Sequence, residues 1–193
     1  MPSFDLRHIR AAEYTNTNGT TAYTNACEVG DAIGVNLELR FAEGRLYAEG
    51  SLAEYLKEAI GGTCSIGAKY IKSAAQTLLY GVRAGSRTVG QKTISSTKLG
   101  ANDSGKYVGF AFYAPDMIDG VKKYTAVLVY RARFGYPAMS FQTKGENFTF
   151  QTPTTTGEFM PDEGADKDLL EVAVCDTEAD AAAWVDAAVN YSE

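Results

Sequence analysis

Two neighbouring segments of this sequence alternate apolar side chains with the period of a β-strand. The first spans residues 107–113 and the second residues 123–134. One face of the second segment would carry Tyr124, Ala126, Leu128, Tyr130, Ala132 and Phe134. Between the segments, Asp119-Gly120 is a dipeptide that tolerates positive φ at a two-residue hairpin turn. The sequence therefore predicts an antiparallel hairpin around which the rest of the chain is organised.

The opposite face of the second segment and a third strand complete the predicted meander. That face carries Val127, Val129, Arg131 and Arg133. After a Gly-Tyr-Pro turn at residues 135–137, apolar and polar residues alternate again within 139–152. We therefore expect three consecutive antiparallel strands.

Length and composition fit a single domain over residues 1–193. Of the 193 residues, 45% are hydrophobic, which is enough to fill one core of ordinary size. No apolar run approaches a membrane span, and the first residues lack the pattern of a signal peptide. Cys27, Cys64 and Cys175 lie far apart without metal-ligand spacing, so we expect free thiols in a reducing compartment. A soluble protein without membrane contact is expected.

Turn and capping residues place the shorter elements. Asn18-Gly19 predicts an N-terminal hairpin between strands at 4–15 and 21–28. A half-buried strand is expected at 35–41. The dipeptide Glu43-Gly44 would then reverse the chain.

Two helices and a last strand follow from the same kind of signal. Ser73 and Gln76 form a capping box before a short helix at 74–80, which Gly81 would end. A strand is expected at 169–175. The C-terminal helix at 177–189 would carry an apolar stripe of Ala181, Trp184, Val185 and Ala188. The expected fold class is mainly β, a β-sandwich or partly open barrel of antiparallel strands with one short internal helix and a C-terminal helix.

Residues 51–60 fit two structures. Ser51 and Glu54 form a capping box, and the apolar residues that follow them lie at helical spacing. Yet alternate apolar residues also share one face of a strand, and Gly61-Gly62 is a typical hairpin dipeptide. On the residues alone, helix and hairpin both stay open.

The charges of the chain are unevenly distributed. Residues 1–145 hold 17 Lys/Arg and 12 Asp/Glu, a balance of +5, whereas residues 146–193 hold one lysine and 12 Asp/Glu, a balance of −11. Residues 83–105 predict an irregular exposed loop, and residues 160–168 an acidic linker. Two interpretations remain: a solvated acidic tail, or an acidic end that docks on a basic surface of a neighbouring copy.

The groups that catalysis or metal binding needs are scarce. His8 is the only histidine, so a histidine metal pair cannot form within one chain, and a Ser-His-acid triad would depend on an N-terminal strand. Asp162, Asp166, Asp168 and Glu171 could hold calcium, but they lack the regular alternation and turn glycine of a known loop, so a solvated linker fits better. We expect no enzyme, no cofactor and no metal.

The charge distribution also argues against a protein that grips nucleic acid. Such a protein needs a basic patch, whereas here the net charge is −6 and the lysines and arginines are scattered. A DNA conduit has the opposite need, because a neutral or acidic polar lining lets the duplex slide. The composition is consistent with a conduit.

Several segments of the sequence, in order, resemble one structural family. They are GVNLELRFAEGRLYAEGSLAEYLKEAI at 34–60, AAQTLLYG at 74–81, KKYTAVLVYRARFGYP at 122–137 and QTKGENFTFQTPTTTGEF at 142–159. Together with their order, these segments resemble the major tail tube proteins of long-tailed bacteriophages, relatives of the tubes of contractile injection and type VI secretion systems. The resemblance favours the hairpin over the helix at 51–60.

The resemblance implies a structural role in the virion. It implies hexameric rings closed by sheet that continues across subunits, and stacking of the rings around a tape measure protein and later the double-stranded DNA. Tail terminator and tip proteins would be further partners, and assembly would take place in the cytoplasm of the bacterial host. It also implies that an extended loop or hairpin at 83–105 reaches a neighbouring subunit. The interface candidates are Val127, Val129, Arg131, Arg133, Asp162, Glu163, Asp166 and Asp168.

A second interpretation belongs to another functional class. The chain could be a monomeric β-sandwich module for carbohydrate binding or adhesion, in which Trp184 and some of the 12 tyrosines form a stacking platform. The position of Trp184 on an apolar helical stripe instead favours a place in the core.

Overall fold

The computed structural model describes residues 5–49, 51–139, 143 and 152–192. The helices are α1 (Ser73–Tyr80) and α2 (Glu178–Ala188). The strands are β1 (Arg7–Thr17), β2 (Thr20–Glu28), β3 (Ala32–Ala48), β4 (Ser51–Ala68), β5 (Arg83–Val89), β6 (Lys92–Lys98), β7 (Val108–Ile118), β8 (Val121–Phe134), β9 (Thr154–Phe159) and β10 (Leu170–Cys175). The fold is mainly β with one short internal helix and one C-terminal helix, as the sequence predicts.

One large antiparallel sheet holds most of the strands. Its path runs in the order β2-β1-β7-β8-β9-β4-β3, and β10 joins it by pairing with β8. β8 is the hub, because its residues 124–129 lie between β7 and β10 while residues 132–134 pair with β9. β5 and β6 form a separate two-stranded sheet. The large sheet stays open and does not close into a barrel.

The two strongest turn signals in the sequence form the turns that they predict. Asn18 and Gly19 have φ angles of 52° and 81°, and Asp119 and Gly120 have φ angles of 51° and 78°. Positive φ at both central residues is the requirement of the hairpin turn that matches the twist of two antiparallel strands. The β1-β2 and β7-β8 hairpins are therefore confirmed.

Both faces of the central strands are buried. The first hydrophobic cluster joins β1, β4, β7, β8, β9 and α1, and its fully buried side chains include Phe110, Phe159, Ile9, Ile66 and Leu79. The second cluster lies under α2, where Ala181 and Val185 pack with residues of β7 and β8. The body of the protein is thus a sheet with a core on each side.

The faces of β8 exchange partway along the strand, contrary to the single face expected from the sequence. Leu128 and the alternate residues before it belong to the second cluster, whereas Ala132 and Phe134 belong to the first. The register shifts here, since Phe110 is opposite Val129 and Val108 is opposite Ala132. Between these two pairs β8 advances by three residues while β7 advances by two. The extra residue of β8 exchanges the faces on which its following side chains lie.

The β3-β4 hairpin is much longer than predicted. Residues 51–60 are strand, so the helix alternative is wrong, but Glu43-Gly44 and Gly61-Gly62 are not turns, and the strands reverse beyond Ala48, which pairs with Ser51. A Cβ on Gly62 would lie 2.5 Å from the ring of Phe159. Gly61 and Gly62 thus do not turn the chain. Because they lack a side chain, they allow β9 to approach β4 closely.

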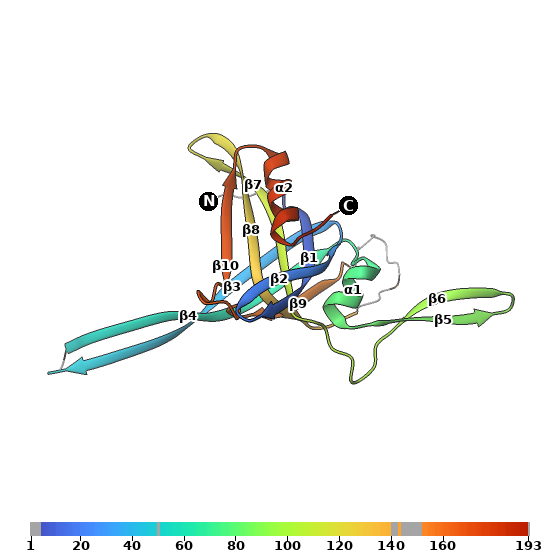
Figure 1. Ribbon diagram of the computed structural model, residues 1–193, viewed down its shortest axis with the longest axis horizontal. Coiled ribbons are helices and arrows are strands. Elements are labelled where there is room, and N and C mark those ends of the chain that lie inside the picture. The colour runs from blue at the N-terminus through green and yellow to red at the C-terminus, as the bar shows by residue number, and fades with distance from the viewer. Residues whose placement is uncertain (1–4, 50, 140–142, 144–151, 193) are drawn as a thin grey trace.

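Two further predictions concern the loops. Residues 83–98 form the regular β5-β6 hairpin, so the expectation of an irregular loop over 83–105 is wrong for most of its length. The third meander strand at 139–152 falls largely outside the described residues. In Figure 1 the β3-β4 hairpin and the β5-β6 hairpin project from opposite ends of the molecule along its longest axis.

The helix ends combine local and tertiary control. Thr177 Oγ1 accepts a hydrogen bond from the backbone nitrogen of Asp180 at 3.1 Å, the predicted cap of α2. Gly81 ends α1 in the left-handed conformation, at a φ of 69°. At the start of α1, Lys72 and not Ser73 occupies the cap position, without a side-chain hydrogen bond. Burial against the first cluster therefore stabilises α1 more than its capping does.

Candidate assembly surfaces

The first pair of interface candidates lies inside the subunit. Val129 is fully buried in the first cluster, and Val127 packs against the same cluster from its partly buried position. Backbone pairing to β7 and β10 surrounds this part of β8 on both edges. Val129 consequently offers no side-chain surface to another molecule. Its burial stabilises β8 within the subunit.

Arg131 forms a compact aromatic and ionic cluster. Its side chain is 16% exposed, and its Nη2 lies 2.8 Å from a carboxylate oxygen of Glu163. The guanidinium also stacks over the ring of Tyr107 at 4.4 Å and lies 5.3 Å from the ring of Tyr14. The guanidinium carbon of Arg133 lies 5.2 Å from the centre of the same Tyr107 ring. Arg131 is therefore paired within the subunit through Nη2, although its buried Nε has no hydrogen-bond partner among the described residues.

The acidic linker at 160–168 docks partly on its own chain. Asp162 accepts a hydrogen bond from the Thr21 hydroxyl at 2.9 Å, and the backbone nitrogen of Glu163 donates to the Tyr14 hydroxyl at 2.9 Å. Asp166 and Asp168 are exposed. The first half of the linker is therefore bound within the subunit and is not a solvated tail, while its second half faces solvent; docking of the acidic end on a neighbouring copy stays a prediction.

Much of the charge asymmetry is likewise resolved inside one subunit. In the described residues, five acidic side chains beyond residue 145 form ion pairs with basic side chains before it. These pairs are Arg40–Glu158, Arg131–Glu163, Lys123–Asp176, Arg7–Glu178 and Arg10–Asp186. The acidic end of the chain is therefore less available to a neighbouring copy than its sequence balance of −11 suggests.

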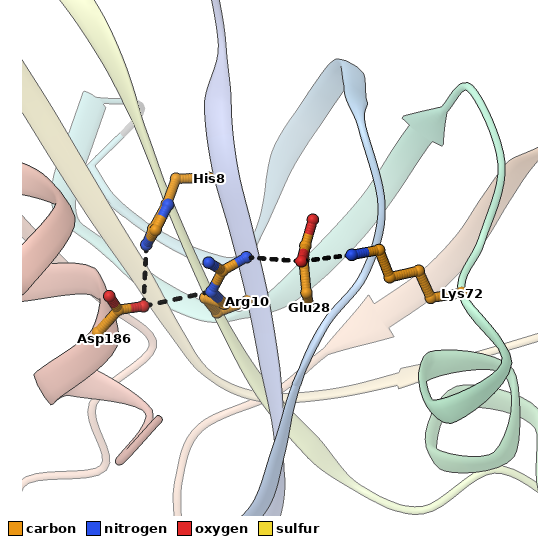
Figure 2. A network of polar contacts seen from close by, with 5 residues as sticks. All are labelled: His8, Arg10, Glu28, Lys72 and Asp186. Atoms are coloured by element: carbon orange, nitrogen blue, oxygen red, sulfur yellow. Dashed lines mark hydrogen bonds and ion pairs between the residues drawn. The ribbon is translucent and has the colours of Figure 1, made fainter. Parts of the chain in front are cut away.

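A chain of ion pairs joins α2 to the N-terminal strands and to the start of α1 (Figure 2). Asp186 on α2 accepts from both His8 Nε2 at 2.8 Å and Arg10 Nε at 3.2 Å. Arg10 continues to Glu28 at 3.7 Å, and Glu28 accepts from Lys72. The hydrogen bond from Lys72 holds the pKa of Glu28 below its usual value. This network holds the C-terminal helix on the body, and no local sequence pattern predicts it.

A shallow groove of about 500 Å³, lined mostly by residues with polar side chains, crosses β3, β4, β8 and β9. Its lining includes Asn36, Thr63, Arg133 and Glu158, together with Cys64. Burial raises the pKa of the Cys64 thiol to about 12, so at neutral pH it is not the thiolate that a cysteine nucleophile requires. The groove offers hydrogen-bonding groups for a polar ligand but no activated nucleophile among its described residues.

Many of the exposed large hydrophobic side chains among the described residues lie on the β3-β4 hairpin. We call its projecting part, residues 41–59, the arm. Leu46, Leu52 and Leu56 on it are 58%, 52% and 61% exposed, and Tyr47 and Tyr55 are exposed beside them. Apolar side chains thus stay exposed on both faces of the arm, and exposed apolar patches often mark interaction sites. The arm is therefore the strongest candidate for an interaction surface.

Sequence reasoning missed the arm as a site, although one signal was present. Apolar residues recur on both strands on each side of residues 49–50, where a glutamate and a glycine stand between two alternating runs. Glu43-Gly44 and Gly61-Gly62 instead predict turns that would divide this single long hairpin.

The sequence matches no protein-family model and no curated protein. Neither described helix is long and apolar enough to cross a membrane. Among the described residues, no group of three or more histidine, cysteine, aspartate or glutamate side chains is placed to hold a metal ion.

Proposed function

We propose that this protein is a major tail tube subunit of a long-tailed bacteriophage. The observation that carries the proposal is the arm, whose exposed leucines and tyrosines a single copy leaves uncovered. Burial of apolar side chains is the main favourable contribution to protein association, so a surface of this composition favours assembly. The sequence resemblance described above supplies the kind of assembly, stacked hexameric rings.

The open sheet supports the same proposal. Its path ends at β2 on one side and at β3 on the other, so within the described ranges these two strands have unpaired edges. Exposed edges promote uncontrolled aggregation unless they are covered, and cyclic assembly covers them in a defined way. In a ring closed through these edges, the strand edges that are unpaired in one copy would form the contacts between subunits.

In this role the protein is a conduit and not a catalyst. Tape measure protein and then double-stranded DNA would occupy the bore, and terminator and tip proteins would bind the tube ends. A bore without net positive charge suits sliding DNA. The ion pair between Arg131 and Glu163 is consistent with that requirement, because it neutralises one of the two arginines near the end of β8. Assembly would take place in the host cytoplasm and the product would be part of the virion.

The alternative is a monomeric carbohydrate-binding module. The polar groove beside Thr63 and Glu158 favours it, since hydroxyl and carboxylate groups bind sugars. Trp184, however, packs against the second cluster, as its helical stripe predicts, which reduces the flat ring surface available for stacking on a sugar.

Size-exclusion chromatography with light scattering, followed by electron microscopy, separates the two functions. We expect a concentration-dependent oligomer that forms rings or tubes with sixfold symmetry. A strict monomer at high concentration that binds glycans saturably would reject the tail tube proposal and support the module.

A further inference from the structure

The β5-β6 hairpin has two chemically different faces. Its register is regular, with Arg83 opposite Lys98, Arg87 opposite Ile94, and Val89 opposite Lys92. Directly opposed residues of an antiparallel pair share a face. One face therefore carries all four basic residues of the hairpin with two exposed apolar residues: Arg83, Arg87, Lys92, Lys98, Val89 and Ile94. The other face carries only alanine, serine and threonine side chains. We call the first one the basic face.

No acid of the hairpin itself neutralises the basic face. Residues 83–98 contain no aspartate or glutamate. Arg83 pairs with Asp103 just beyond the hairpin, at 3.0 Å. In the described part of the chain, Arg87, Lys92 and Lys98 form no salt bridge. The outer half of this face thus offers cations and apolar groups together.

The arm also has two different faces. On one face, Glu43 pairs with Lys57 at 3.1 Å and with Arg45 at 3.4 Å, and Lys57 lies over the ring of Phe41 at 4.4 Å. Arg45 lies over the ring of Tyr55 at 5.5 Å. The charges on this face are therefore satisfied within the arm.

The other face of the arm is acidic and apolar. Leu46 is opposite Glu54, Gly44 is opposite Leu56, and Ala42 is opposite Glu58, so these residues share one face. We call it the acidic face. Within the described residues, neither Glu54 nor Glu58 forms a salt bridge, while Leu46 and Leu56 are more than half exposed. This face combines anions with leucines, the complement of the basic face.

The two faces cannot meet within one chain but match in size. The hairpins that carry them project from opposite ends of the molecule (Figure 1). At about 3.3 Å per residue, the seven-residue strands of β5-β6 extend about 23 Å and the eight residues 41–48 of the arm about 26 Å. Either surface is long enough to cover the other.

We propose that the basic face of the β5-β6 hairpin in one copy packs on the acidic face of the arm in a second copy. The inference rests on the proposed function only in requiring that the chain self-associates, and it assigns the contact through which it does so. Burial of Leu46 and Leu56 against Val89 and Ile94 would supply affinity, and the opposite charges would select these faces over the others. Because two different surfaces meet, the contact is head-to-tail and generates closed rings or open filaments.

Disulfide cross-linking tests the contact directly. The variant Leu56→Cys/Ile94→Cys places one thiol on each face, and oxidation should give a ladder of covalent oligomers that reductant abolishes. The matched control Leu56→Cys/Thr93→Cys moves the second thiol by one residue to the hydroxyl face of the hairpin and should give no ladder. Equal ladders from both variants, or none from the first, would overturn the proposal.

Charge reversal with rescue gives an independent test. Glu54→Lys/Glu58→Lys and Arg87→Glu/Lys92→Glu should each raise the concentration needed for half-assembly about tenfold or more, because like charges would then face each other. An equimolar mixture of the two variants should assemble again, since each reversed face finds its reversed partner. Thr88→Glu/Thr93→Glu adds acidic residues to the hydroxyl face and should assemble like the wild type. Failure of the mixture to assemble, with each variant still folded by circular dichroism, would contradict the pairing.

Other outcomes separate this inference from the proposed function. If sixfold tubes form but Leu56→Cys/Ile94→Cys gives no covalent ladder, the tail tube function would be supported and the pairing of the two faces would be wrong. Cross-linked linear chains that never close would keep the pairing and reject the tube. If Arg87→Glu/Lys92→Glu weakened binding of duplex DNA and left assembly unchanged, the basic face would be a polyanion site and the pairing would be wrong.

Discussion

The β7-β8 hub and the arm are both long antiparallel hairpins with alternating apolar residues, yet they differ in what covers them. On β7 and β8, the first cluster packs on one face and α2 on the other, so Phe110 and Ala111 are both buried. On the arm, Leu46 and Leu56 alternate in the same way and remain exposed. Alternation therefore specifies a strand, while coverage depends on which other segments reach it.

The ionic contacts of the two regions differ in the same sense. Arg131 in the body is 16% exposed and meets Glu163, which is 53% exposed, whereas Arg45 on the arm is itself 56% exposed where it meets Glu43. A buried cation that loses its anion is costly, and pairs between exposed groups contribute little. The body should thus depend on its internal contacts for folding, and the hairpins should depend on other copies for their function.

The substitution Val129→Pro should have the largest effect, because it removes a backbone donor from the strand that pairs with both β7 and β10. We expect the free energy of unfolding to fall by about 3 kcal/mol or more, with loss of rings. Urea denaturation monitored by circular dichroism measures the free energy of unfolding, and electron microscopy shows whether rings form. Val89→Pro, at the exposed end of the β5-β6 hairpin, is the control and should leave the unfolding of the body unchanged. Normal rings from Val129→Pro would show that β8 is not the hub.

The double substitution Leu46→Ser/Leu56→Ser should separate folding from assembly. Both side chains are exposed in the single copy, so unfolding should change by no more than about 0.5 kcal/mol. If assembly buries them, it should weaken by about 1.5 kcal/mol or more for each residue. Analytical ultracentrifugation gives the second quantity. Unchanged sedimentation would show that the arm leucines lie outside the subunit contacts.

Paired substitutions should rank the two ionic contacts. Glu163→Gln leaves the guanidinium of Arg131 without its anion in a largely buried site, and should cost about 1–2 kcal/mol of folding free energy. Glu43→Gln on the arm should cost close to nothing, because both of its partners are solvated. Chemical denaturation measures the free energy of unfolding of both variants. Equal losses of that free energy would contradict the distinction between body and arm.

The smallest effect concerns acid stability. The hydrogen bond from Lys72 lowers the pKa of Glu28 in the folded state, so this carboxylate stabilises the protein above its unfolded pKa of about 4.3. That contribution is lost as the pH falls through the lowered folded pKa. Thermal melting between pH 3 and 7 should show a shallower acid slope for Glu28→Gln, and Lys72→Met should give the same change. Identical slopes in all three proteins would remove Glu28 from the acid transition.

The elements that the sequence alone determined are those with local physical causes. Positive φ at Asn18-Gly19 and Asp119-Gly120 is a property of the dipeptides themselves, and both turns form where they were expected. Thr177 caps α2 through a hydrogen bond only three residues away. The strands of the hub followed from alternation, because a period of two needs no knowledge of the partner.

Only the tertiary structure decided which signals prevail and which side chains meet. Gly61-Gly62 has the composition of a turn but lies within β4, because β9 packs where a side chain would stand. The inversion of faces between Leu128 and Ala132 depends on register with β7, which no single segment encodes. Ion pairs such as Arg10 with Asp186 join residues 176 positions apart. Contacts of that separation arise from packing of the whole chain, and so does the absence of cover that leaves the arm exposed.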